Sequence, residues 1–221
     1  MDAIVPSANN SLRQAAEAMS TILSRRNIHH AVIGGVAVLL LGHERQTSDL
    51  DVVIDVKNAE ELDLVSDYLI EGDARFSKEC LKLYFTPSEG QQSRVLIERL
   101  PIGSLGLPTQ LNILRPGLVP VLHPRILILT KIKRCSWLIE STRPKSRLKF
   151  LSDESDIEFL IEWLVEHDEK IDFVGYQSPD MDRLYTAVQK MVKFWERTGK
   201  EEKAQRICLV LENRDRERIM R

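Results

Sequence analysis

The stretch from residue 31 to residue 55 constrains the fold of this chain more than any other part of its sequence. It begins with a short apolar run that stops at two adjacent glycines, Gly34 and Gly35, after which a short apolar helix is predicted. A polar turn follows, and the chain then enters an apolar strand interrupted by two carboxylates, Asp49 and Asp51. A strand, a glycine turn, a helix and a second strand in this order are typical of an α/β protein.

The two carboxylates of the predicted strand are expected to act together. Asp49 and Asp51 are two positions apart, so their side chains share one face of the strand, about 6–7 Å apart along the chain. Neighbouring carboxylates repel each other, and burying them without a partner is unfavourable. A divalent cation relieves this repulsion, and hard oxygen ligands suit Mg²⁺ or Mn²⁺. The spacing therefore predicts a metal site on this strand.

The glycine pair adds a second functional element. Glycines at a turn from strand to helix allow backbone N–H groups to approach a phosphate closely, and a helix N-terminus favours negative charge. The predicted helix, Val36–Leu41, follows Gly34 and Gly35 directly and is closed by Gly42. A phosphate-binding turn beside a pair of metal-binding carboxylates is typical of phosphoryl or nucleotidyl transfer.

These residues resemble the signature of the nucleotidyltransferase superfamily that includes DNA polymerase β. In that signature a hydrophobic residue, Gly and Gly or Ser precede a short helix, and Asp–hydrophobic–Asp/Glu–hydrophobic follows it. With Arg45 and Thr47 ahead of the carboxylates, the stretch most resembles the small antibiotic and toxin-type nucleotidyltransferases. The resemblance implies an NTP substrate, Mg²⁺ or Mn²⁺ as cofactor, and phosphate contacts from Gly34, Gly35 and Arg45. Thr47 either bonds a phosphate or shapes the turn.

A third carboxylate is expected from a later strand. In the superfamily that this sequence resembles, a third acidic residue lies beside the first pair, and Glu98 on the predicted strand 94–100 matches it best. The family more often has Asp at this position. The alternative is an edge-strand glutamate paired with Arg94, Arg99 or another surface cation. If the resemblance holds, Asp49, Asp51 and Glu98 are both the metal ligands and the catalytic residues.

Two basic features follow the core. Lys131 lies on a helix predicted to start at His123-Pro124, and small nucleotidyltransferases have a similar helix with a lysine near the phosphates. The alternative is a solvated lysine on a surface helix. The segment 143–149 carries four Lys or Arg residues around Pro144, and it either attracts phosphates or an RNA acceptor or forms a solvated loop.

The remaining pattern predicts a mixed α/β (α+β) protein. Helices are predicted over 11–26 and 59–71, strands over 81–85 and 94–100, a loop with a short strand over 101–120, and helices after residues 123, 152, 180 and 201. The two strands form a hairpin whose turn contains Pro87 and Gly90. We expect a small mixed β-sheet nucleotidyltransferase core with flanking helices over residues 1–150. An α-helical C-terminal region follows over residues 151–221.

Composition bounds the class of protein. A chain of 221 residues with 43% hydrophobic and 29% charged residues is typical of a soluble globular protein of one domain or slightly more. The net charge of −2 argues against non-specific nucleic-acid binding over the whole surface, although it leaves room for a local basic groove. Three scattered cysteines, no long apolar run and no signal-peptide pattern predict a cytoplasmic protein without a membrane partner.

The sequence thus predicts an ATP- or other NTP-dependent nucleotidyltransferase that transfers an NMP to a hydroxyl and releases pyrophosphate. The acceptor remains open between a small molecule, an RNA end and a protein hydroxyl, and a homodimer is possible. One alternative is a non-catalytic member of the same fold that binds a nucleotide or a protein partner, as in toxin–antitoxin pairs. Another is an interaction protein, which requires an exposed apolar patch on the helices of residues 180–218.

Overall fold

The computed structural model describes residues 8–87 and 94–221. The chain forms two compact units. We call Met1–Leu105 with Ile113–Leu122 the sheet unit, and Gly106–Asn112 with His123–Arg221 the helical unit. The domain boundary predicted at residue 150 falls inside a continuous helix, α5 (Pro144–Glu166), so the transition between the two units lies earlier in the chain.

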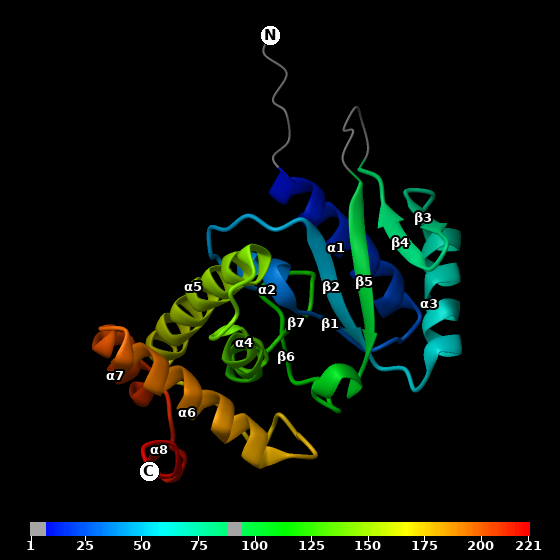
Figure 1. Cartoon of the computed structure of the whole chain (residues 1–221). Helices are drawn as coiled ribbons and strands as arrows, with labels where there is room; N and C mark the ends of the chain where they lie inside the picture. The colour runs from blue at the N-terminus through cyan, green and yellow to red at the C-terminus, as the bar shows by residue number, and fades with distance from the viewer. Residues whose placement is uncertain (1–7, 88–93) are drawn as a thin grey trace. The chain divides into compact units, whose positions relative to one another are not determined.

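The sheet unit is built on a mixed sheet, as predicted. Its strands within the described residues are β1 (His30–Val32), β2 (Asp49–Ile54), β3 (Phe76–Glu79), β4 (Lys82–Phe85), β5 (Val95–Pro101), β6 (Ile113–Leu114) and β7 (Val121–Leu122). Their order is β3-β4-β5-β2-β1-β7-β6 (Figure 1). The pairs β2–β5 and β1–β7 are parallel, whereas the other neighbouring strands are antiparallel.

The strand β2 lies in the middle of this sheet because of its apolar residues. Leu50, Val52, Val53 and Ile54 have no exposed surface. Central strands that are covered on both faces are typically continuous apolar runs of this kind. β2 therefore provides a rigid support for the two carboxylates that interrupt its apolar pattern.

Over residues 8–87 and 94–105, the sheet unit has the helices α1 (Ala8–Arg25), α2 (Gly34–Leu40) and α3 (Ala59–Gly72). α1 and α3 contact each other and the sheet, and Figure 1 shows them side by side. A capping box begins α3, since Asn58 Oδ1 accepts from Glu61 N–H at 2.9 Å and Glu61 Oε2 accepts from Lys57 N–H at 2.7 Å. A short 3₁₀ helix, η1 (Ser104–Gly106), ends the continuous part of this unit.

The helical unit contains α4 (Pro124–Leu138), α5, α6 (Met181–Arg197), α7 (Glu201–Leu209) and α8 (Asn213–Ile219). Its core takes Ile157, Leu160 and Leu164 from α5 and Val188, Met191 and Trp195 from α6, all nearly or fully buried. Met191 and Trp195 of α6 therefore belong to the hydrophobic core. α5 is the longest of these helices, with 23 residues, and carries charges along its length. In the described part of the chain, no helix is long and apolar enough to cross a membrane.

The structure corrects several predicted elements. The segment after Arg143 is not a loop, because Pro144 begins α5 and the chain continues as helix through Glu166. Asp153 and Asp156 consequently lie inside α5 rather than at the start of a helix. The predicted C-terminal helix is interrupted between α7 and α8, and β3 was missed. The predicted hairpin of β4 and β5 is confirmed by their antiparallel pairing, while Gly90 of its turn lies outside the described residues.

Candidate active site

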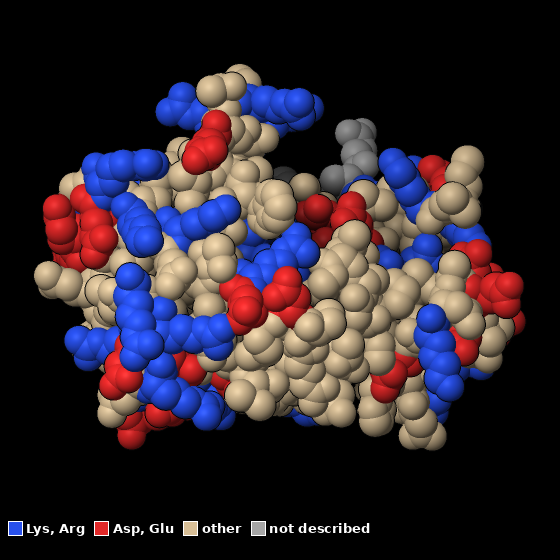
Figure 2. Space-filling model, turned by 60° about the horizontal axis from the view of Figure 1, so that its bottom comes forward, with Lys and Arg blue, Asp and Glu red and all other residues tan. Residues whose placement is uncertain are grey.

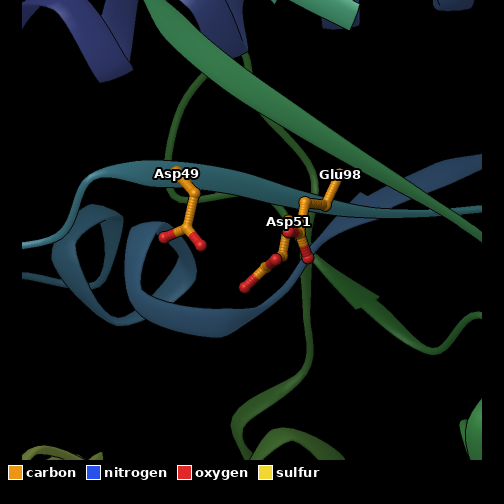
Figure 3. A group of neighbouring side chains, drawn as sticks. All are labelled: Asp49, Asp51 and Glu98. Atoms are coloured by element: carbon orange, nitrogen blue, oxygen red, sulfur yellow. The ribbon is translucent and has the colours of Figure 1, made fainter. Parts of the chain in front are cut away.

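The three predicted carboxylates are brought together by neighbouring strands. β2 and β5 run parallel with Asp51 opposite Glu98, so both side chains lie on the same face of the sheet. One oxygen from each of Asp49, Asp51 and Glu98 lies within 4.8 Å of the others. Figure 3 shows Asp49 and Asp51 pointing the same way from β2, with Glu98 reaching toward Asp51 from the adjacent strand. We call these residues the acidic triad.

The acidic triad is accessible, whereas its neighbours in the strands are buried. Asp49 and Asp51 are half-buried and Glu98 is exposed. Leu50 and Ile97, which alternate with them, are at most 2% exposed. Alternation along both strands therefore presents carboxylates on one side of the sheet and apolar side chains on the other.

Gly34 lies directly against the triad. The N–H group of Ile33 donates to the carbonyl of Asp51 at 3.0 Å, which brings the start of α2 to β2. Gly34 has φ +68°, and a Cβ at this position would lie 1.9 Å from Asp51 Oδ2. Any side chain here would displace the carboxylate in addition to straining the backbone, so both requirements select glycine.

Gly35 brings the turn before β2 into the same site. A Cβ on Gly35 would lie 2.6 Å from Thr47 Oγ1 and 2.9 Å from Arg45 Cζ. Thr47 Oγ1 in turn donates to Asp49 Oδ1 at 3.3 Å. The two glycines, Arg45, Thr47 and the first two carboxylates therefore form one continuous set of contacts.

The alternative partners predicted for Glu98 are engaged elsewhere. Arg94 forms a bidentate ion pair with Glu79 on β3, with Nη2 and Oε2 2.9 Å apart. Arg99 donates to the backbone carbonyls of Leu62 and Leu81 at 3.3 and 3.1 Å. These contacts of the two arginines leave Glu98 beside Asp51.

Comparison with solved structures identifies the fold. The chain is similar to an antigenic nucleotidyltransferase-like protein from Paracoccidioides brasiliensis, with a TM-score of 0.63 and 19% identity over 88% of this chain and 93% of that chain. This chain has the nucleotidyltransferase fold. CdnC from E. coli MS115-1, solved with ATP, aligns over 86% of this chain and 66% of that chain with a TM-score of 0.33 and 14% identity. No family model and no curated protein matches the chain.

Within the nucleotidyltransferase fold, Lys131 has an internal position. It lies on α4 of the helical unit and is 1% exposed, with Nζ 2.6 Å from Asp156 Oδ2 and 3.4 Å from Asp153 Oδ1. Lys131 is therefore neither the solvated lysine nor the phosphate-facing lysine that the sequence left open.

Arg134 completes this internal arrangement, which we call the buried ion-pair cluster (Lys131, Arg134, Asp153 and Asp156). The Arg134 guanidinium makes a bidentate contact with the carboxylate of Asp153, at 2.6 Å for Nε and Oδ2. Burial works to raise the pKa of Asp153, but the hydrogen bond from Arg134 and the charge of Lys131 hold it below the usual 3.8. The cluster is thus a charged but neutralised link between α4 and α5.

Sequence reasoning missed one residue beside the site. Asn9, near the start of α1, donates from Nδ2 to the carbonyl of Arg45 at 3.4 Å. The contact spans 36 positions of the chain, and no local pattern connects an N-terminal helix to this turn. Asn9 helps to position the backbone that carries Arg45.

The triad fits a divalent cation by its chemistry. Three carboxylates offer hard oxygen donors within a small radius, and their partial exposure leaves room for water and a substrate to complete an octahedral shell. Gly34 allows the Asp51 carboxylate to pack directly against the start of α2, where a Cβ would displace it. Carboxylate oxygens of this kind suit hard divalent cations.

Proposed function

We propose that this protein is a metal-dependent nucleotidyltransferase that transfers an NMP from an NTP to a hydroxyl acceptor and releases pyrophosphate. The observation that supports it most strongly is the position of Glu98 beside Asp49 and Asp51, next to the turn at Gly34 and Gly35. Three carboxylates beside a glycine turn combine metal ligands with a binding site for phosphates.

The carboxylates have distinct parts in this proposal. Asp49, Asp51 and Glu98 hold divalent ions, which when bound neutralise phosphate charge and favour the alkoxide form of the acceptor. Thr47 donates to Asp49 and so fixes the orientation of its carboxylate. Gly34 allows Asp51 to take the position that it has in the structure.

The glycine turn and Arg45 hold the triphosphate. The first N–H groups of a helix have no acceptor within the helix, so the turn at Gly34 and Gly35 offers backbone donors to the β and γ phosphates. The Arg45 guanidinium lies against Gly35 and adds a fixed positive charge that matches phosphate oxygens. These groups place the α-phosphorus near the carboxylates.

The transfer step is an in-line displacement. The acceptor oxygen forms a bond to the α-phosphorus while the bond between that phosphorus and the bridging oxygen of the β-phosphate breaks, and pyrophosphate leaves with the electron pair. Glu98 is the exposed carboxylate of the triad, and it accepts the proton of the acceptor hydroxyl.

Two alternative functions have less support. A non-catalytic fold relic has no need for a third carboxylate beside the first two, yet Glu98 lies there. An interaction protein requires an exposed apolar patch on the helices of residues 180–218. Among the described residues of that segment, Leu209 is the only strongly exposed large apolar side chain.

Calorimetry of NTP binding tests the proposal. Each NTP is titrated into the wild type, the Asp49→Asn/Asp51→Asn variant and a control, Asp55→Asn/Asp67→Asn, which removes the same charge from exposed positions of the sheet unit. We expect binding that depends on Mg²⁺ or Mn²⁺ in the wild type and the control and is lost in the first variant. An acceptor screen by pyrophosphate release then follows. A folded wild type that binds no NTP would exclude this function.

A further inference from the structure

Positive charge is concentrated in one segment of the helical unit. Residues 133–151 contain six Lys or Arg residues and a single acid, Glu140, although the whole chain has a net charge of −2. The structure turns most of this segment into the end of α4 and the start of α5. Lys145, Arg147 and Lys149 are thereby held at exposed positions near the start of α5, whereas Arg134 is paired with Asp153.

α6 adds a second row of cations beside this segment. Lys190, Lys193 and Arg197 are exposed and are spaced three and four residues apart, so they share one face of the helix. α6 packs against α4. Figure 2 shows that Lys and Arg side chains gather in several groups on one face of the molecule, with smaller groups of Asp and Glu between them.

Two adjoining hollows lie between these basic rows. The first, of about 430 Å³, is lined by Phe150, Phe194 and Arg147 among others. The second, of about 410 Å³, is lined by Trp137, Lys190, Lys193, Phe194 and Arg197 among others. Phe194, Ile139 and Glu140 border both, so the hollows are consecutive parts of one groove.

Each hollow combines an aromatic surface with cations. Trp137 is 68% exposed, and the guanidinium of Arg183 lies 5.3 Å from the centre of its ring. Phe194 meets Phe150 edge-on at 5.2 Å between ring centres. The guanidinium lies over one face of the ring, and the large exposed fraction of Trp137 provides ring surface on which a base can stack.

We propose that this groove, which we call the basic–aromatic groove, binds single-stranded nucleic acid. Two successive hollows with aromatic walls match two successive flat bases, and the cations on their rims match the phosphates that alternate with the bases. Aromatic stacking together with a basic groove is how proteins bind single strands without reading their sequence. Bases that are paired within a duplex are not available for this stacking.

This inference is independent of the proposed nucleotidyl transfer. All residues of the basic–aromatic groove belong to the helical unit, whereas the acidic triad belongs to the sheet unit. Binding of an oligonucleotide requires neither an NTP nor a divalent metal. Failure of one proposal thus leaves the other untouched.

Fluorescence anisotropy tests the groove with fluorescein-labelled oligouridine and oligothymidine of about 12 nucleotides, a length within the usual site sizes. The full chain is compared with Lys190→Ala/Lys193→Ala/Arg197→Ala and with Trp137→Ala and Trp137→Phe. Lys57→Ala/Lys82→Ala/Arg221→Ala removes the same charge from exposed positions elsewhere. Circular dichroism verifies that each variant is folded.

We expect saturable binding of single strands, weakened at least about tenfold by the groove variant and little by the control, with a smaller salt dependence because fewer counterions are released. Trp137→Ala is expected to weaken binding about fivefold or more, and Trp137→Phe much less, because phenylalanine still stacks. Preference for RNA over DNA or the reverse identifies the natural strand. The proposal is overturned if no oligonucleotide binds, if both triple variants lose affinity equally, or if a duplex of the same length binds with equal affinity. It is also overturned if the protein binds phosphatidylserine vesicles but no oligonucleotide.

Discussion

The molecule contains two groups of carboxylates that differ in surroundings. In the sheet unit, Asp49 and Asp51 are half-buried, Glu98 is exposed, and Gly34 packs directly against Asp51. In the helical unit, Asp153 and Asp156 are 1% exposed and are met by cations of the same unit. The first arrangement leaves the carboxylates accessible to a ligand, and the second neutralises them internally.

The difference shows how a structural charge cluster is distinguished from a candidate site. Buried charges need fixed partners, because the desolvation of each ion costs several kcal/mol. The buried ion-pair cluster has such partners and links α4 to α5. The acidic triad keeps like charges together at an accessible face, an arrangement that a bound cation stabilises. The exposure of the carboxylates, rather than the number of acids, separates the two groups.

The largest expected effect concerns the buried cluster. Lys131→Met leaves the buried Asp156 without the cation that lies 2.6 Å from it, while Asp153 keeps Arg134. We expect a loss of about 3–5 kcal/mol in the free energy of unfolding, as is typical when one member of a buried pair is removed. Urea denaturation at pH 7 measures it. Lys131→Met/Asp156→Leu is expected to recover much of the loss. A change of less than about 1 kcal/mol for the single variant would show that the buried ion-pair cluster contributes little to the free energy of unfolding.

A smaller effect is expected on the rate of pyrophosphate release when Glu98 is changed. Glu98→Gln keeps the shape of the side chain but removes its charge and its ability to accept a proton, so we expect metal-dependent pyrophosphate release to fall about 10²-fold or more. Glu60→Gln, at an exposed position on α3, serves as the control and keeps the wild-type rate. Stability is expected to remain unchanged in both. Wild-type release by Glu98→Gln would remove the third carboxylate from the mechanism.

The two glycines at the ends of α2 provide a matched pair. Gly34→Ala and Gly42→Ala both place a side chain on a backbone with positive φ, which costs about 1–2 kcal/mol of stability. Only the Cβ at Gly34 meets Asp51, whereas the Cβ at Gly42 meets nothing within 4 Å. We therefore expect calorimetry to show weaker metal-dependent NTP binding in Gly34→Ala, by about tenfold, or 1.4 kcal/mol, and unchanged binding in Gly42→Ala. Equal binding in both would contradict the predicted contact.

The smallest effect is a pH dependence of stability. The folded-state pKa of Asp153 lies below 3.8 and that of Glu154, which accepts from Lys200 and Trp195 against the effect of burial, lies below 4.5. Both carboxylates therefore stabilise the fold at pH values above their unfolded-state pKa. This contribution is lost as the pH falls through their lower folded-state pKa. The urea midpoint should fall less steeply between pH 7 and pH 3 in Asp153→Asn than in the wild type. An equally steep fall in both would contradict the lowered pKa of Asp153.

Much of the candidate site was predictable because its parts lie in one continuous stretch. The glycine turn, Arg45, Thr47 and the carboxylates of β2 are close in sequence, so strand alternation and turn chemistry were sufficient to predict their convergence. Glu98 was found through the resemblance to a known superfamily and through its position in an apolar strand. Its register against Asp51 comes from long-range pairing of β2 with β5, which no local pattern encodes.

The role of Lys131 was not predictable in the same way. Its carboxylate partners lie 22 and 25 positions later, on a helix whose start was placed too late in the sequence. A signal was nevertheless present. Lys131 and Arg134 are three residues apart on one helix and Asp153 and Asp156 are three apart on the next, which is the spacing of two facing, complementary pairs.

Electron paramagnetic resonance of Mn²⁺ tests the contrast between the two groups most directly. The signal of free Mn²⁺ is measured during titration, with a non-hydrolysable NTP present, in the wild type, in Asp49→Asn/Asp51→Asn and in Asp153→Asn at a temperature where each is folded. We predict that the wild type and Asp153→Asn remove Mn²⁺ from solution and that the triad variant does not. Retained Mn²⁺ binding in Asp49→Asn/Asp51→Asn, or its loss in folded Asp153→Asn, would contradict the assignment of the acidic triad as the metal site.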